Sequence, residues 1–197
     1  MKKIPSVFKR DYEGTRQVYD EVVPGSEWVL SGEGTPTEKI DGTACMVRDG
    51  KLYKRYDAKK GKTPPKGWEP CEDAPDIPTG HWPGWLAVGD GPEDQWHREA
   101  LQNVLLNAPA ELRDGTYELV GPKVQGNPYG LEIHDLWRHG LGVLDGDYRL
   151  LPIPPRDFKG ICDYLETYVI EGIVWHHPDG RMAKIKRRDF GIAWPPE

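Results

Sequence analysis

The chain has 197 residues, of which 37% are hydrophobic and 29% are charged, and its net charge at neutral pH is −6. This length and balance suit one soluble globular domain spanning residues 1–197 and exclude a mostly disordered chain. No apolar stretch approaches the roughly 20 residues that cross a bilayer, and we expect no secretory signal. Three cysteines without metal or disulfide spacing favour a cytoplasmic location.

Short apolar runs separated by Gly, Asp and Pro predict an α+β fold with antiparallel strands and few helices. The first predicted hairpin covers residues 43–48 and 51–56, which flank an Asp-Gly turn signal. A stretch rich in Pro, Gly and Trp over 63–85 predicts an ordered loop. The spacing of apolar residues then predicts helices over 93–106 and 157–166.

A second hairpin is predicted over residues 170–177 and 181–186. A two-residue turn at Asp179-Gly180 would pair Lys184 with Trp175 and so set the register of the whole hairpin. Because paired residues share a face, one face would then carry Glu171, Ile173, Trp175, Lys184 and Lys186. An acid and two lysines on one face of a strand pair indicate a functional site.

The charge is unevenly distributed along the chain. The stretch from Lys51 to Lys66 holds seven basic residues and one acid, and residues 181–188 hold five basic residues and no acid. Two basic patches on an acidic body are expected where phosphates are bound locally. Charged strands that simply face solvent would account for either patch equally well.

Ionisable residues recur along the chain in a distinctive order. The series begins with Glu38-Lys39-Ile40-Asp41-Gly42 and continues with Arg55, which the first hairpin places opposite Ala44. Glu118 follows in Tyr117-Glu118-Leu119-Val120-Gly121, and the series ends with Glu171-Gly172-Ile173-Val174 and Lys184-Ile185-Lys186. A lone Lys-x-Asp-Gly arises easily by chance, whereas the ordered series is specific.

This series resembles the covalent nucleotidyltransferase superfamily of DNA ligases, RNA ligases and mRNA-capping enzymes. The run from Tyr117 to Pro128 is similar to that of small stand-alone 5′-to-3′ RNA ligases, and the resemblance covers residues 28–191. It implies an α+β fold in which antiparallel sheets enclose a nucleotide cleft, with flanking helices. Since eleven residues follow Lys186, we expect no C-terminal OB domain, which favours the RNA-ligase branch.

The resemblance implies an ATP-dependent RNA ligase with Mg²⁺ or Mn²⁺ as cofactor. Lys39 would attack ATP to form a lysyl-AMP, the AMP would pass to an RNA 5′-phosphate, and a 3′-hydroxyl would then seal the break. The expected partner is RNA with a 5′-phosphate and a 3′-hydroxyl, without a membrane. A requirement for an accessory protein or added domain in sealing stays open.

Roles at the phosphates and metal follow from the chemistry. Lys39 must lose a proton before it attacks, at an ordinary pKa of about 10.4. Lys184 and Lys186 would lower that pKa and bind the α-phosphate. Asp41 and Glu171 would hold a magnesium ion through water.

Further residues would bind the nucleotide or the nucleic acid. Glu38 and Arg55 are assigned to the nucleotide, with Arg55 meeting a phosphate of ATP or the RNA 5′-phosphate. By the resemblance, Glu118 would accept hydrogen bonds from the ribose. His134 stands where a base-stacking aromatic residue is often found, and Tyr129 or Trp137 are alternatives for that role.

The same residues are compatible with different functions. The chain could be a non-catalytic nucleotide- or RNA-binding module on a decayed ligase fold, or a nucleotidyltransferase that acts on a protein or small molecule. GTP could replace ATP. Lys39 could be a solvated lysine before a turn, Glu171 a surface partner of Arg188, and His134 a structural histidine.

Overall fold

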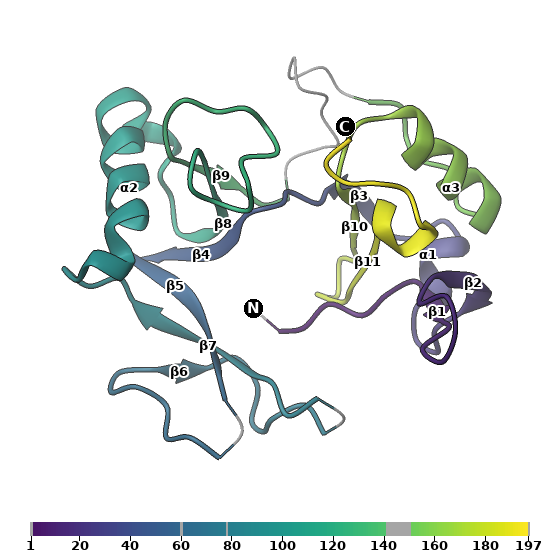
Figure 1. Ribbon diagram of the computed structural model, residues 1–197, viewed down its shortest axis with the longest axis horizontal. Coiled ribbons are helices and arrows are strands. Elements are labelled where there is room, and N and C mark those ends of the chain that lie inside the picture. Colours follow the sequence, from purple (N-terminus) through teal and green to yellow (C-terminus); the bar gives the residue numbers. More distant parts are fainter. Residues whose placement is uncertain (1, 60, 78, 141–150, 197) are drawn as a thin grey trace. The chain divides into compact units, whose positions relative to one another are not determined.

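The computed structural model describes residues 2–59, 61–77, 79–140 and 151–196. Contacts divide the chain into two compact units. Unit 1 comprises Met1–Lys3 and Asp41–His139, and unit 2 comprises Ile4–Ile40 and Gly140–Glu197. Each unit combines antiparallel strands with a few helices (Figure 1), which confirms the predicted α+β class. The nucleotide cleft and the one-domain organisation stay predictions.

Unit 1 is built on a six-stranded antiparallel sheet with the order β6-β7-β5-β4-β8-β9. Its strands are β4 (Thr43–Arg48), β5 (Lys51–Ala58), β6 (Glu69–Pro70), β7 (Trp82–Ala87), β8 (Gly115–Val120) and β9 (Asp135–Arg138). Its helices are η1 (Pro92–Asp94), α2 (Gln95–Asn107) and η2 (Pro109–Glu111). Helix α2 lies beside the sheet (Figure 1) and packs Ala100 and Val104 against buried residues of β4, β8 and β9. The predicted helix over 93–106 is thereby confirmed.

The first hairpin has the predicted register, with Arg48 paired with Lys51 and Cys45 with Lys54. Both turn residues have positive φ, 52° at Asp49 and 70° at Gly50. A type I′ turn requires positive φ at both of its central residues, and an Asp-Gly pair readily adopts this conformation.

The prediction of a loop throughout residues 63–85 is wrong at its end, where Trp82 begins strand β7. Pro83 lies in this strand and pairs with Asp57 of β5. Its carbonyl accepts a hydrogen bond from the backbone N–H of Cys71. In a strand, the N–H and C=O of one residue point the same way, so the donor that proline lacks would point away from β5. The β5–β7 ladder therefore loses no hydrogen bond.

Unit 2 contains a three-stranded antiparallel sheet with the order β11-β10-β3 and a separate β1–β2 hairpin. Its elements are β1 (Phe8–Arg10), β2 (Val18–Val22), α1 (Glu27–Leu30), β3 (Thr35–Glu38), α3 (Phe158–Thr167), β10 (Gly172–His176), β11 (Met182–Lys186) and η3 (Arg187–Phe190). Asp157 caps α3 by accepting a 2.8 Å hydrogen bond from the N–H of Gly160. The short helix predicted over 157–166 is confirmed.

The second hairpin differs from its predicted register by one residue. Val174 pairs with Lys184 and Gly172 with Lys186. The backbone of His177 pairs with that of Arg181, so the turn has three residues, Pro178 to Gly180. The last of them, Gly180, has a φ of +91°. A turn that ends on a left-handed glycine is the usual three-residue hairpin loop.

This shift changes which residues share a face. The predicted face of Glu171, Ile173, Trp175, Lys184 and Lys186 is wrong. Ile173, Trp175, Ala183 and Ile185 are completely buried in the core of unit 2, together with Phe8, Ile161 and Leu165. Lys184 and Lys186 lie on the opposite face, with Gly172 and Val174.

Candidate active site

Lys39 lies directly after β3, where its backbone N–H donates a 2.9 Å hydrogen bond to the carbonyl of Gly172. Its ammonium donates to Oε2 of Glu171 at 2.5 Å. The side chains of this ion pair are 22% and 9% exposed, so both groups are largely shielded from water. The first and fourth motifs predicted from the sequence are therefore joined by a direct contact.

The predicted lysines of β11 lie on the same side of the sheet as Lys39. Lys39 and Lys186 lie on either side of Gly172 across the three strands. Lys184 lies two residues before Lys186 in β11 and therefore on the same face. Burial, followed by repulsion from Lys39 and Lys186, lowers the pKa of Lys184 to about 8. The three ammonium groups thus form one cationic face, with Glu171 beside it.

Gly172 makes this arrangement possible because its Cα hydrogen faces the backbone of β11. A Cβ at this position would lie 2.2 Å from the carbonyl oxygen of Ile185 and 2.9 Å from Cα of Lys186. No rotamer change can relieve a contact with backbone atoms. The glycine of the Glu-Gly motif is thus required by the close approach of two strands.

Glu38 lies on the other face, because it pairs with the buried Ile173. Burial, with a smaller contribution from the negative charge of Glu171, raises the pKa of Glu38 to about 7. A carboxyl with this pKa is partly protonated at neutral pH and can donate a hydrogen bond. Its assignment to the nucleotide stays a prediction.

Replacing Lys184 by methionine is expected to stabilise unit 2 at neutral pH. The folded pKa of about 8 lies below the ordinary value of 10.5, so the unfolded chain binds more protons between these pH values and wild-type stability rises through that window. Below it, the buried ammonium costs up to about 3 kcal/mol. Urea unfolding at pH 7 and pH 10 should show the advantage of Lys184→Met shrinking as pH rises. A variant less stable than wild type at pH 7 would contradict this expectation.

In unit 1, Glu118 pairs with Ala44 of β4 and with Trp137 of β9. These residues share the sheet face opposite α2. Glu118 is 9% exposed, and its Oε2 contacts Nε2 of His139 at 2.8 Å. The ring of Trp137 lies 4.8 Å from that of Tyr129. An acid flanked by aromatic rings is thus assembled from residues that are distant in sequence.

The Asp41-Gly42 half of the first motif also belongs to unit 1. The backbone N–H of Asp41 donates to the hydroxyl of Tyr129 at 2.7 Å. A Cβ on Gly42 would lie 2.2 Å from the carbonyl oxygen of Leu119 and 2.7 Å from Cγ of Glu118. Gly42 therefore allows the motif loop to lie directly against the strand that carries Glu118.

Two described residues of the basic stretch from Lys51 to Lys66 have acidic partners. Lys54 is paired with the buried Asp94, and Nε of Arg55 donates to Asp57 at 3.0 Å. Lysines 51, 59, 62 and 66 are exposed, and Lys60 lies outside the described residues. The accessible part of this patch is therefore smaller than the sequence suggests.

His134 is a packed residue in this structure. It is 3% exposed and stacks on Trp96 of α2, with ring centroids 4.6 Å apart. Its Nδ1 contacts Glu99 at 2.8 Å, and its Nε2 accepts from the N–H of Lys123 at 3.3 Å. Its ring offers almost no surface to a base, which favours a structural role.

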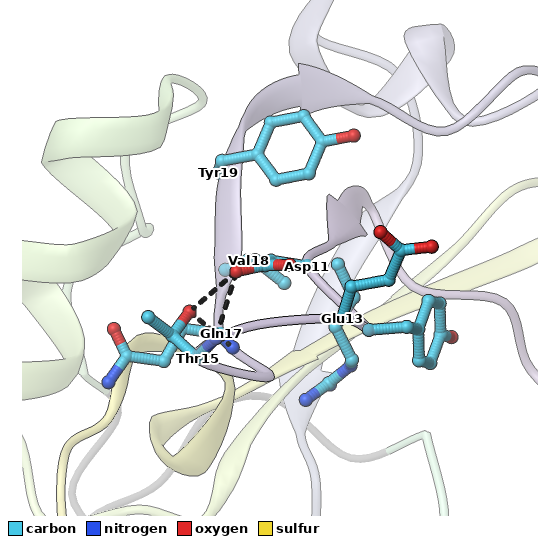
Figure 2. A pocket seen from close by; sticks show the side chains of 8 residues that line it. Asp11, Glu13, Thr15, Gln17, Val18 and Tyr19 are labelled. Carbon is cyan, nitrogen blue, oxygen red and sulfur yellow. Dashed lines mark hydrogen bonds between the residues drawn. The ribbon is translucent and has the colours of Figure 1, made fainter.

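A cavity of about 570 Å³ in unit 2, at the connection between β1 and β2, is lined by none of the motif residues. Figure 2 shows Asp11 and Glu13 among its lining residues, with Asp11 hydrogen-bonded to Thr15. Arg10, which also lines it, is already paired with Asp189. Carboxylates without an available cation repel phosphate, so this cavity is a poor nucleotide site.

Within the described ranges, no cluster of three or more His, Cys, Asp or Glu side chains suits a metal ion. Asp41 and Glu171 as metal-binding carboxylates therefore stay a prediction. No helix in the described part of the chain is long and apolar enough to span a membrane.

Comparison with known proteins identifies the family. The model of the RNA ligase 1 family matches residues 95–197, just over half of the chain, and this match contains Glu118, Glu171, Lys184 and Lys186. The chain is 28% identical to RNA ligase 1 of Danio rerio, over 98% of this chain and 82% of the relative. It is 27% identical to RNA ligase 1 of Mus musculus, over 98% and 81% of the two chains. The chain belongs to the RNA ligase 1 family.

Proposed function

We propose that this protein is an ATP-dependent RNA ligase that works through a lysyl-AMP intermediate on Lys39. The observation that carries the proposal is the contact between Lys39 and Glu171 beside two further lysines. In a member of the RNA ligase 1 family, this group supplies a nucleophile, a proton acceptor and cations for a phosphate.

The first step is attack of Lys39 Nζ on the α-phosphorus of ATP, which forms an N–P bond and releases pyrophosphate. The attacking amine must be neutral when it attacks, and Lys184 and Lys186 lie on the same face beside it. Glu171 accepts a hydrogen bond from Nζ, which supports a role for it as the proton acceptor. The same lysines would stabilise the negative charge that develops on the α-phosphate.

Magnesium would neutralise charge on the triphosphate and would be held, through water, by the carboxylates of Glu171 and Asp41. Oxygen donors of this kind fit a hard cation.

The second and third steps transfer the AMP and seal the strand. The 5′-phosphate of RNA attacks the lysyl-AMP, breaks the N–P bond and forms a 5′-to-5′ pyrophosphate. The 3′-hydroxyl of the other strand then attacks the RNA phosphorus and releases AMP. The exposed lysines of the stretch from Lys51 to Lys66 would bind the RNA backbone without regard to sequence.

On the nucleoside, we assign the ribose to Glu118 and the base to Trp137 rather than His134. Trp137 stands opposite Glu118 in the β8–β9 ladder and is only partly buried. A tryptophan at this place offers a ring to a purine, whereas the ring of His134 is already stacked on Trp96.

Replacing Trp137 by leucine is expected to raise the KM for ATP in adenylylation by about tenfold, because one stacking contact is lost. His134→Ala should instead lower the melting temperature and leave this KM within about twofold of wild type, since the variant loses its contacts with Trp96, Glu99 and Lys123 and none with the base. Single-turnover adenylylation at a series of ATP concentrations measures both. The opposite pattern would return the base to His134.

Intact mass spectrometry after incubation with magnesium and each nucleoside triphosphate tests the proposed function. ATP should add the mass of one AMP, and peptide mapping should place the adduct on Lys39. Gel assays should then show joining of 5′-phosphorylated RNA, little joining when an all-DNA strand supplies the 3′-hydroxyl, and none with a 5′-hydroxyl. Nucleotide binding without an adduct would support a binding module, and an adduct without RNA joining would support another acceptor.

A further inference from the structure

Glu118 is held by a histidine that the sequence patterns did not reveal. Nε2 of His139 lies 2.8 Å from Oε2 of Glu118, and the two side chains are 19% and 11% exposed. This contact joins the last residue of unit 1 to the middle of β8. No other hydrogen bond among the described residues uses the Glu118 carboxylate.

The strand register explains why the two side chains meet. Beyond the end of β9, the backbone N–H of His139 donates to the carbonyl of Thr116 at 3.0 Å, which continues the β8–β9 ladder by one row. His139 and Trp137 alternate with Arg138, so they project from the same face. Glu118 lies on that face, with Trp137 directly opposite and His139 diagonal to it.

The surroundings of the ring determine which nitrogen carries the proton. Nδ1 of His139 is buried and has no hydrogen-bond partner among the described residues. A proton on Nδ1 would leave an unpaired buried donor and would direct the lone pair of Nε2 at a carboxylate. A ring with its proton on Nε2 avoids both penalties and donates to Glu118.

We infer that His139 is a positioning residue that orients Glu118 for recognition of the nucleotide ribose. With Oε2 occupied by His139, the lone pairs of Oε1 stay available to a ribose hydroxyl. A carboxylate without this donor can rotate about its side-chain torsions and loses the directed acceptor. This inference rests on the proposed function and assigns His139 control over discrimination between ATP and its deoxy analogues.

Two variants of His139 separate orientation from general packing. The amide nitrogen of glutamine can occupy the place of Nε2, whereas that of asparagine corresponds to Nδ1 and cannot reach Glu118. We compare single-turnover adenylylation of wild type, His139→Gln and His139→Asn with ATP, 2′-deoxyATP and 3′-deoxyATP. The ratio of kcat/KM between ATP and each analogue is the quantity of interest, because it isolates the ribose hydroxyl.

Wild type should prefer ATP over at least one deoxy analogue. His139→Asn should reduce that preference by about tenfold or more, the effect of a hydrogen bond to a charged group, and His139→Gln should keep it within about threefold of wild type. The loss in His139→Asn should appear with ATP and be nearly absent with the analogue that lacks the recognised hydroxyl. A structural role alone would lower the rates with all three nucleotides equally.

The outcomes separate a failure of the proposed function from a failure of the role inferred for His139. A wild-type protein that forms no adduct overturns the proposed function and this inference with it. Adduct formation with undiminished ATP preference in His139→Asn overturns the inference alone. If that variant does not fold, nitrogen NMR of the wild-type imidazole, recorded at a pH where the spectrum shows a neutral ring, decides instead. The Nε2–H tautomer supports the role, and the Nδ1–H tautomer overturns it.

Discussion

Lys39→Arg is expected to form no AMP adduct while keeping the fold of the wild-type protein. Arginine retains the positive charge and can still donate a hydrogen bond to Glu171, the contact that Lys39 makes at 2.5 Å. Its guanidinium does not deprotonate in proteins and has no free amine to attack phosphorus. We therefore expect adenylylation to fall by at least about 10⁴-fold, measured by intact mass and by transfer of labelled AMP from ATP.

The matched control is Lys159→Arg on helix α3. The side chain of Lys159 is 82% exposed and pairs with Asp163 one helical turn away, so this variant changes a lysine of the same unit outside the site. It should label like wild type, and both variants should melt within a few degrees of it. Labelling of Lys39→Arg to the wild-type extent would move the nucleophile to another residue.

Gly172→Ala is expected to lose both stability and adenylylation. The added methyl group would meet the backbone of Ile185 at 2.2 Å, so β10 and β11 must separate at the end that carries Lys186. Forcing atoms into a packed contact costs about 3 kcal/mol, which lowers the melting temperature of a chain of this size by about 10 °C. Calorimetry and single-turnover adenylylation measure the two effects.

Gly89→Ala provides the comparison within the other unit. A Cβ there would make only an ordinary contact, 3.6 Å from Oδ2 of Asp94, and its φ lies outside the positive range. Its melting temperature should stay close to that of wild type. If Gly172→Ala melted within about 2 °C of wild type, the close strand approach would not be essential.

The predictability of each hairpin depended on its turn. Asp49-Gly50 has one favourable interpretation, because both residues accept positive φ without further help. Around Asp179-Gly180, the preceding Pro178 also suits a turn, and either two or three residues can close the loop. Only the packing of Ile173 and Ile185 in the core selects between these registers, and packing is not visible in the local pattern.

The site was predictable where chemistry determines residue type, and less so where packing determines exposure. Lys39 and Glu171 were singled out by their motifs and lie in contact. By sequence, His134 and Trp137 are equally suitable aromatic neighbours of β8, the strand that carries Glu118. In the structure, the ring of Trp96 from α2 covers His134. His139 belongs to no motif, and its contact with Glu118 emerges only from the strand register.

The three-residue turn after β10 also limits the length variation that this region can accept. Most surface hairpins tolerate an inserted or deleted residue at the tip, since the loop alone absorbs it. Here, removing one residue from the turn while the strands stay paired would exchange the two faces of β11, and Lys184 and Lys186 would enter the core that Ala183 and Ile185 now fill. Related chains that differ in length at this loop must therefore compensate with a bulge or lose the cationic face. For enzyme engineering, this tip is a poor place for a tag or a deletion, despite its exposure.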